Sequence, residues 1–131
     1  MPRLLLLDDD GRLALLAAGM LAVEGAPGFS EAIPCSLGEP SSDPLPTAVL
    51  GEIGLLLPPP VRSLASLPRQ PNDILVSLGG TPHPDARLHL PCPPLSDDAP
   101  PLVRRASARF ARDRLAHALQ GALASLSLTQ G

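Results

Sequence analysis

The residues with the clearest chemical potential in this sequence form an acidic cluster near the N-terminus. Directly after the apolar run Leu4–Leu7, the chain reads Asp8, Asp9, Asp10, Gly11 and Arg12. Carboxylates this close together can hold a divalent cation weakly, because Mg²⁺ and Ca²⁺ prefer oxygen ligands. They repel bound anions strongly where water is scarce. A solvated acidic loop without a resident metal ion is the simplest interpretation of the cluster.

The other residue types that commonly carry chemistry are scattered along the chain. Cys35 and Cys92 are isolated and lack the spacing of a disulfide framework or a zinc site, so we expect small buried thiols. His83, His89 and His117 fall in a predicted loop, at a strand end and in a helix, where no two share a face as metal ligands would. The sequence therefore predicts no metal site and no cofactor.

Length and composition define the class of protein. The 131 residues suit one domain spanning 1–131, and a hydrophobic content of 44% is too high for a disordered chain. The 18 prolines are about three times the usual share. All ten basic residues are arginine, so mechanisms that need a lysine amine are excluded. A net charge of −3 argues against nucleic-acid binding, which needs a basic excess.

Targeting signals are not recognisable in the chain. The apolar run Leu4–Leu7 is too short for a signal peptide and is ended by three carboxylates. No apolar run approaches the roughly 20 residues that span a bilayer. We therefore predict a soluble, cytoplasmic protein that does not act at a membrane.

Apolar patterning predicts strands that alternate with helices. The expected strands are Leu4–Leu7, Phe29–Ser36, Asp73–Leu78 and Ala86–Leu90. The expected helices are Leu13–Val23, Thr47–Ile53 and a long final helix after Pro100, with a short helical turn within Val61–Leu67. This order predicts a three-layer α/β/α sandwich around a four-stranded parallel sheet.

The final helix carries two sets of residues with different expected roles. Its core stripe, at helical spacing, is predicted to contain Leu102, Ala106, Phe110, Leu115, Leu119, Ala122 and Leu126. A basic face off that stripe contains Arg104, Arg105, Arg109 and Arg112. We interpret the basic face as a possible contact surface for a protein partner with acidic groups.

Several motifs in order resemble the low-molecular-weight protein tyrosine phosphatases and the arsenate reductases of the same fold. The segment 48–54 resembles the family helix that ends in Glu-Ile-Gly, and Arg62-Ser63 stands where the family has Arg-Ser. The segment 72–78 resembles the family's third strand, and 87–91 resembles the Arg-Leu-His-Trp-Pro of arsenate reductases. The resemblance covers about Leu4 to Leu126 and implies the low-molecular-weight phosphatase fold.

The same resemblance implies that the family's chemistry is missing. The family has a nucleophilic cysteine in a Cys-x5-Arg loop after its first strand, whereas Asp8 stands at the cysteine position here. The family's general-acid Asp-Pro pair is replaced by Cys92-Pro93-Pro94, with Asp97 nearby but displaced. The reductases' further cysteines after the third strand are also absent. We therefore predict a catalytically inactive relative: a non-enzymatic binding, regulatory or structural subunit that acts through protein–protein contacts.

Two alternatives retain an enzyme. The run Asp8–Leu13 also resembles the first motif of haloacid-dehalogenase-type phosphatases, which implies magnesium, Asp8 as nucleophile and Asp10 as acid. The same run is similar to the acidic start of a response-regulator receiver. Dehalogenase-type phosphatases and receivers both need a lysine, and this chain has none. The second alternative is a phosphatase or arsenate reductase with relocated groups, such as Cys35 or Cys92.

Overall fold

The computed structural model describes residues 1–130, with side chains described through residue 126. The elements are β1 (Leu4–Asp8), α1 (Arg12–Glu24), β2 (Ala32–Ser36), α2 (Leu45–Gly51), β3 (Arg62–Ser63), the 3₁₀ helix η1 (Leu64–Ser66), β4 (Ile74–Leu78), β5 (Leu88–Leu90) and α3 (Pro101–Gln130). The predicted α/β fold is confirmed. Each predicted strand and helix is present, with ends that differ by a few residues.

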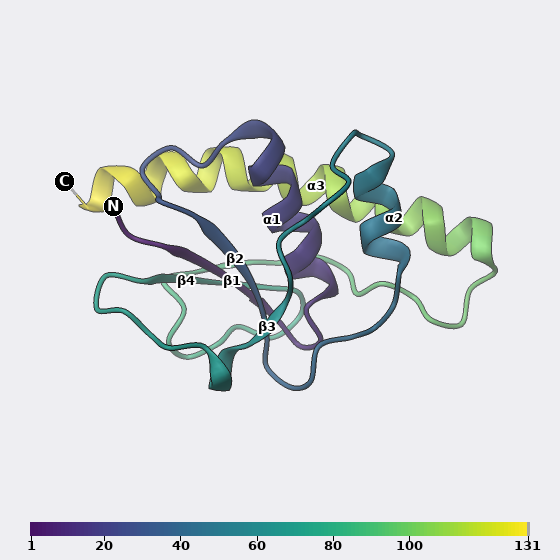
Figure 1. The fold of residues 1–131 in the computed structure, drawn as a ribbon, viewed down its shortest axis with the longest axis horizontal. Coiled ribbons are helices and arrows are strands. Elements are labelled where there is room, and N and C mark those ends of the chain that lie inside the picture. The colour runs from purple at the N-terminus through teal and green to yellow at the C-terminus, as the bar shows by residue number, and fades with distance from the viewer. Residues whose placement is uncertain (131) are drawn as a thin grey trace.

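The strands form one parallel sheet in the order β3-β2-β1-β4-β5, with β1 at its centre (Figure 1). β1 pairs with β2 from Leu4 opposite Ala32 to Asp8 opposite Ser36, and with β4 on its other side. The first four residues of β1 are buried leucines, as expected for a strand covered on both faces. The apolar run that precedes the acidic cluster is therefore the middle of the sheet.

The sheet has five strands rather than the four predicted. The additional strand, β3, contains only Arg62 and Ser63, which pair with Cys35 and Ser36 at the end of β2. A two-residue strand has no period-2 apolar pattern that a sequence could show, and Arg62 is exposed at the edge of the sheet. Pairing with β2 alone makes this segment a strand.

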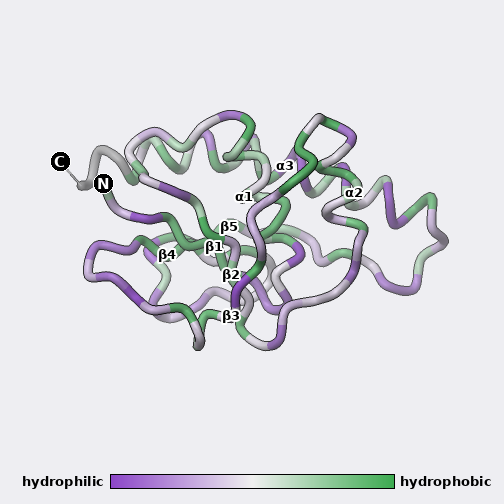
Figure 2. The backbone as a smooth tube through the Cα atoms, in the orientation of Figure 1, coloured by the Kyte–Doolittle hydropathy of each residue, from purple (hydrophilic) through white to green (hydrophobic). Residues whose placement is uncertain are grey.

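The two faces of the sheet are covered differently (Figures 1 and 2). Helices α1, α2 and α3 pack together over one face, where Leu4, Leu6 and Val76 from the strands meet the helical side chains in the larger core. A smaller core on the opposite face joins Leu5 and Leu7 to the segment around η1. The protein thus has three layers: helices, sheet and a thinner layer built around η1.

The buried face of α3 differs from the predicted stripe. Leu115, Leu119 and Leu126 are buried as predicted, but Leu102 is 84% exposed and Phe110 is 60% exposed. The first half of the buried face consists instead of Ala108 and Ala111. These small residues let α3 approach the helices beneath it closely, and the periodicity alone cannot distinguish the two faces. None of the helices within residues 1–130 is long and apolar enough to cross a membrane.

Candidate active site

The acidic cluster lies at the carboxyl end of β1, where the order of strands reverses. The chain passes from β1 to β2 on one side and later places β4 on the other. Open parallel sheets bind ligands in the crevice outside the strand ends at such a switch point. Asp8 is the last residue of β1 and Arg12 is the first of α1, so the cluster forms the connection at that point.

The Asp8 side chain points under the N-terminus of α1. Its carboxylate accepts hydrogen bonds from the Ala14 N–H at 3.0 Å and the Leu13 N–H at 3.3 Å. Gly11 makes this turn possible: its φ of 88° is left-handed, and an added Cβ would lie 2.4 Å from a methyl carbon of Val61. The carboxylate therefore takes the helix N–H groups that would otherwise be available to a bound anion.

Burial makes Asp8 the unusual acid of the cluster. Its side chain is enclosed, and this desolvation raises the pKa of Asp8 from 3.8 to about 7, against the lowering effect of the Ala14 hydrogen bond. The charges of Asp10 and Asp9 raise the pKa further. A carboxyl group that titrates near neutral pH beside a cavity has the properties of a nucleophile or a general acid-base group.

A cavity of about 250 Å³ opens in front of Asp8. It is lined by Asp8, Asp9, Asp10, Arg12, Leu13, Leu78, Gly79, Gly80, Pro94, Leu95 and Asp97. The acidic cluster is therefore brought together with the loop after β4 and the loop before α3. Sequence reasoning missed Gly79, Gly80 and Leu95, which have no distinctive chemistry. Asp97, which seemed displaced from the acid position, lies on this cavity.

Among the described residues that line the cavity, Arg12 is the only basic one, and it lies among carboxylates. Its guanidinium donates to Asp10 at 2.9 Å, to Asp97 at 2.7 Å and to Asp43 at 3.2 Å. One arginine thus connects three separate segments: the acidic cluster, the loop before α2 and the loop before α3. The charged side chains that line the cavity are four aspartates and one arginine. This excess of carboxylates disfavours the binding of doubly charged anions.

The residues present do not fit a magnesium site as arranged. Both oxygens of Asp8 accept backbone N–H groups, and both oxygens of Asp10 accept N–H groups of Arg12. Within the described part of the chain, no three acidic, histidine or cysteine side chains converge as ligands. Asp10 is also directed toward Arg12, so the pairing of Asp8 with Asp10 that the dehalogenase-type resemblance implies has a different geometry here.

The two cysteines lie on opposite faces of the sheet. Cys35 belongs to the smaller core and Cys92 to the larger one, and both thiols are buried and free. Burial raises the pKa of Cys35 to about 11 and also raises the pKa of Cys92. Because the thiolate is the reactive form, neither cysteine is activated as a nucleophile, and the two cannot form a disulfide with each other in this fold.

His89 stabilises the loop that follows β4. Its Nε2–H donates to the Gly79 carbonyl at 2.8 Å, which leaves Nδ1 to accept the hydroxyl hydrogen of Ser77 at 2.7 Å. Ser77 Oγ in turn accepts the His83 N–H at 3.3 Å. These bonds fix the segment of Gly79 that lines the cavity, so His89 supports the site rather than entering it.

Comparison with solved structures identifies the architecture. The chain superposes on an arsenate reductase in its reduced state with a TM-score of 0.69 and 16% identity, covering 97% of this chain and 100% of that one. An arsenate reductase in its phosphate-binding state gives 0.66 and 15%, covering 95% and 98%. The arsenate reductase of Archaeoglobus fulgidus gives 0.63 and 11%, covering 90% and 98%. The fold is that of the arsenate reductases. No protein-family model and no curated protein matches the sequence.

This similarity corrects the predicted function class. The sequence analysis predicted that the chain is not an enzyme, because the groups expected from the phosphatase and arsenate reductase resemblance were missing. That prediction is wrong: the solved structures that match over nearly the whole chain are arsenate reductases, which are enzymes. The prediction rested on the missing family residues, and their absence does not exclude an enzyme with the same fold.

The basic face of α3 makes contacts within the protein. The carboxylate of Glu52 accepts N–H groups of Arg109 at 2.6 and 2.8 Å and of Arg105 at 3.2 Å. The pKa of Glu52 is lowered to about 2, mainly by the hydrogen bonds from Arg109. Arg112 is buried and donates to the Val49 carbonyl at 2.7 Å. These residues hold the end of α2 against α3 in the arsenate reductase-like fold.

The raised pKa of Asp8 predicts a pH-dependent stability. The folded state binds the Asp8 proton more tightly than the unfolded state, so this contribution to stability is complete below the unfolded pKa and is lost as pH rises through about 7. Between about pH 6 and about pH 8 it should fall by about 1.4 kcal/mol. Urea unfolding followed by circular dichroism measures this change. The Asp8→Asn variant, with histidines unchanged, should lack that part of the decline; an identical decline in both proteins would contradict the assignment.

Proposed function

We propose that this protein is an enzyme that hydrolyses a phosphate ester and that uses the Asp8 carboxylate as its nucleophile. The observation that carries the proposal is the position of Asp8: a buried carboxyl group with a pKa of about 7, beside a cavity at the carboxyl end of the central strand. In the family that the sequence resembles, that strand end holds the nucleophilic cysteine. Carboxylates serve as nucleophiles in other phosphoryl-transfer enzymes.

The proposed reaction has two steps. An oxygen of Asp8 forms a bond to phosphorus as the bond from phosphorus to the leaving-group oxygen breaks, and that oxygen takes a proton from solvent water. Water then attacks the phosphorus of the acyl phosphate. This step releases the free carboxylate of Asp8 together with phosphate, or with a phosphate monoester when the substrate is a diester, and the proton of the attacking water passes to solvent. The Oδ2 atom of Asp8 has the longer hydrogen bond, 3.3 Å, and is the oxygen more easily freed for attack.

Arg12 has the role of binding the anion. Its guanidinium lies on the same cavity and already contacts Asp97 at 2.7 Å, so a phosphate oxygen that enters can replace the exposed Asp97 carboxylate on it. The surplus of carboxylates favours a substrate whose phosphate carries a single negative charge. Hydrolysis is favoured over arsenate reduction because both cysteines are buried with raised pKa values on opposite faces of the sheet.

Turnover of two chromogenic esters tests the proposal. We expect the protein to hydrolyse bis(p-nitrophenyl) phosphate, which is singly charged, more efficiently than p-nitrophenyl phosphate, and to do so in the presence of a chelator. Inactivity toward both esters contradicts the proposal. Turnover that requires added magnesium would instead favour the dehalogenase-type alternative, and loss of turnover in Cys92→Ser would favour a relocated thiol.

Removing one negative charge from the lining of the Asp8 cavity should increase the rate at which the doubly charged substrate is hydrolysed. The exposed Asp9 side chain lines the cavity and raises the pKa of Asp8 through its charge. We expect Asp9→Asn to increase kcat/KM for p-nitrophenyl phosphate by about fivefold, a gain of about 1 kcal/mol from reduced repulsion. Steady-state kinetics on both esters check this, and the increase should be smaller for the singly charged diester. An equal or larger gain for the diester would refute the electrostatic explanation.

A further inference from the structure

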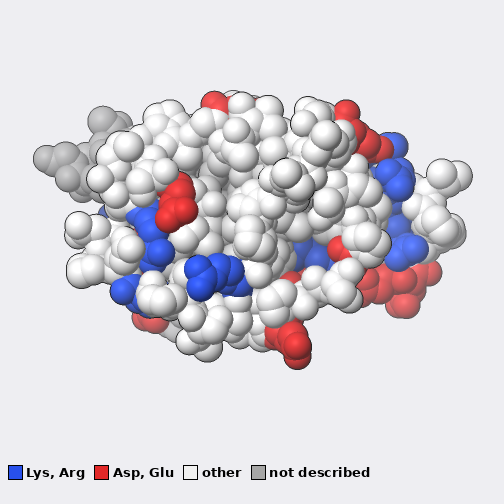
Figure 3. All heavy atoms as spheres, viewed as in Figure 1, with Lys and Arg blue, Asp and Glu red and all other residues white. Residues whose placement is uncertain are grey.

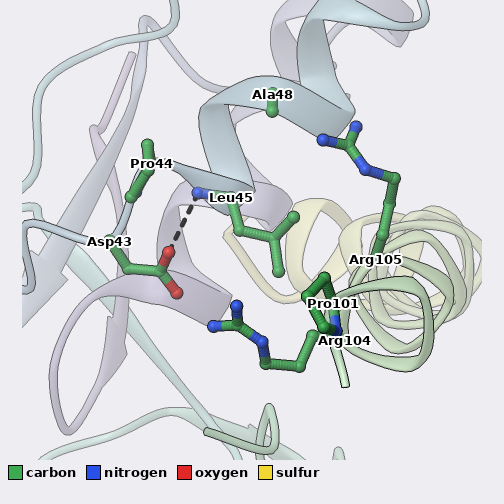
Figure 4. A pocket seen from close by; sticks show the side chains of 7 residues that line it. All are labelled: Asp43, Pro44, Leu45, Ala48, Pro101, Arg104 and Arg105. Carbon is green, nitrogen blue, oxygen red and sulfur yellow. Dashed lines mark hydrogen bonds between the residues drawn. The ribbon is translucent and has the colours of Figure 1, made fainter. Parts of the chain in front are cut away.

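A second cavity, of about 260 Å³, lies where the N-terminus of α3 meets α2 (Figure 4). Two arginines, Arg104 and Arg105, form its basic side, and Pro44, Leu45 and Pro101 provide apolar walls. Figure 3 shows blue arginine atoms beside acidic groups at this end of the molecule. Asp43 also borders the cavity, and the guanidinium group of Arg104 extends toward its side of the cavity in Figure 4. The first cavity described above does not include Arg104 or Arg105.

Arg104 is the side chain in this cavity that lacks protein partners. It makes no side-chain hydrogen bond or ion pair with another described residue, and its Nε is enclosed without an acceptor. Its neighbours on α3 differ, because Arg105, Arg109 and Arg112 all contact Glu52. A guanidinium that is partly removed from water without an acceptor is energetically costly unless something else supplies one.

The charges around the cavity leave a positive excess on the α3 side. One carboxylate, Glu52, is shared by three arginines, at distances of 2.6, 3.2 and 3.6 Å. Asp43 offers little compensation to Arg104, because its oxygens accept the Leu45 N–H at 3.0 Å, drawn as a dashed line in Figure 4, and an N–H of Arg12 at 3.2 Å. An anion that reaches Arg104 would supply the missing acceptor.

We propose that this cavity binds a small organic oxyanion whose head group pairs with Arg104 and whose apolar body contacts Pro44, Leu45 and Pro101. Guanidinium groups bind planar oxyanions through paired N–H donors, so a carboxylate or a phosphate monoester has suitable chemistry. The cavity is slightly smaller than the usual range for ligand sites, which limits the body to about one ring. The residues that would hold this ligand take no part in the proposed reaction at Asp8, although Asp43 at the border of the cavity also accepts an N–H of Arg12.

Titration of ¹⁵N-labelled protein with benzoate and with phenyl phosphate tests this site. The Arg104 Nε–H and the backbone amides of Leu45 and Ala48 should shift saturably, and the two probes distinguish a carboxylate from a phosphate ligand. Acetate and inorganic phosphate have the head groups without the ring, so they should bind at least several-fold more weakly. Equal binding of acetate and benzoate, and of the two phosphates, would overturn the assignment of the apolar walls.

Two matched variants identify the arginine responsible. Arg104→Gln should weaken binding of the better probe at least about tenfold, followed on the Leu45 and Ala48 amides. Arg114→Gln removes the same charge from an exposed position ten residues further along α3, about 15 Å away, and should change the affinity less than about twofold. No saturable shift in the wild type, or equal affinities in the two variants, would overturn the proposal whether or not the protein hydrolyses phosphate esters.

Discussion

Replacing Asp8 by asparagine is expected to lower kcat/KM for phosphate ester hydrolysis by at least about 10³-fold. An amide is not a nucleophile toward phosphorus, so the first step of the proposed reaction is lost. The variant should still fold: the amide has nearly the same shape, and its oxygen can accept the Ala14 N–H that Asp8 accepts at 3.0 Å. The loss should therefore appear in activity rather than in secondary structure, and circular dichroism of the variant checks this.

The neighbouring carboxylates provide the matched controls for this experiment. Asp9→Asn changes the same charge by the same chemistry one residue away, and it should retain or increase activity. Wild-type kcat/KM should also rise with pH through about 7, as Asp8 ionises to the nucleophilic form. If Asp8→Asn retains wild-type turnover, or if Asp9→Asn is equally inactive, Asp8 is not the nucleophile.

Truncation of Leu115 to alanine is expected to destabilise the protein by about 3 kcal/mol. Leu115 is 1% exposed and lies in the larger core beneath α3, so its removal leaves a cavity between the helices and the sheet. Leu102→Ala is the matched control on the same helix. Leu102 is 84% exposed, and its truncation should cost less than about 0.5 kcal/mol. Together the two variants test which face of α3 is buried.

Urea unfolding followed by circular dichroism gives both free energies, because the chain has no Trp or Tyr for a fluorescence measurement. The difference between the two variants should exceed about 2 kcal/mol. Similar losses for Leu115→Ala and Leu102→Ala would mean that Leu102 is buried as well, as the apolar stripe in the sequence predicted. The orientation of α3 described above would then be incorrect.

The central part of the fold was predictable from the sequence because it is locally encoded. Four leucines followed by acids specify β1, and the nearly continuous apolar segment after Arg12 specifies α1. β3 could not be predicted, since Arg62 and Ser63 are extended only through pairing with β2. The buried face of α3 depends on how closely α3 approaches α1 and α2, and this distance is a property of the packed structure.

The candidate site was predictable in its composition and not in its geometry. The acidic residues could be named from the sequence, and their place after β1 followed from the strand pattern. The hydrogen bonds from the Leu13 and Ala14 N–H groups to Asp8 arise from the turn at Gly11, and no residue type indicates them. The contact of Arg12 with Asp97, 85 residues away, requires the complete fold.

The basic face of α3 illustrates the same difference between composition and geometry. Five arginines within eleven residues suggested a surface for an acidic partner. In the folded protein, Glu52 engages Arg105, Arg109 and Arg112, which thereby join α2 to α3. Only the positions of these side chains show that the enclosed Nε of Arg104 has no acceptor among the described residues. A contact of this face with a protein partner stays a prediction.

The most direct test of Asp8 as the nucleophile is to find the covalent intermediate. Acid-quenched mixtures of the protein with p-nitrophenyl phosphate, digested and analysed by tandem mass spectrometry, should contain one phosphoryl group on the peptide Leu4–Arg12, with fragment ions that place it on Asp8. The adduct should be absent from Asp8→Asn and present in Asp9→Asn. A phosphoryl group on Cys35, Cys92 or any other residue during turnover would contradict the proposed mechanism, as would unchanged adduct formation in Asp8→Asn.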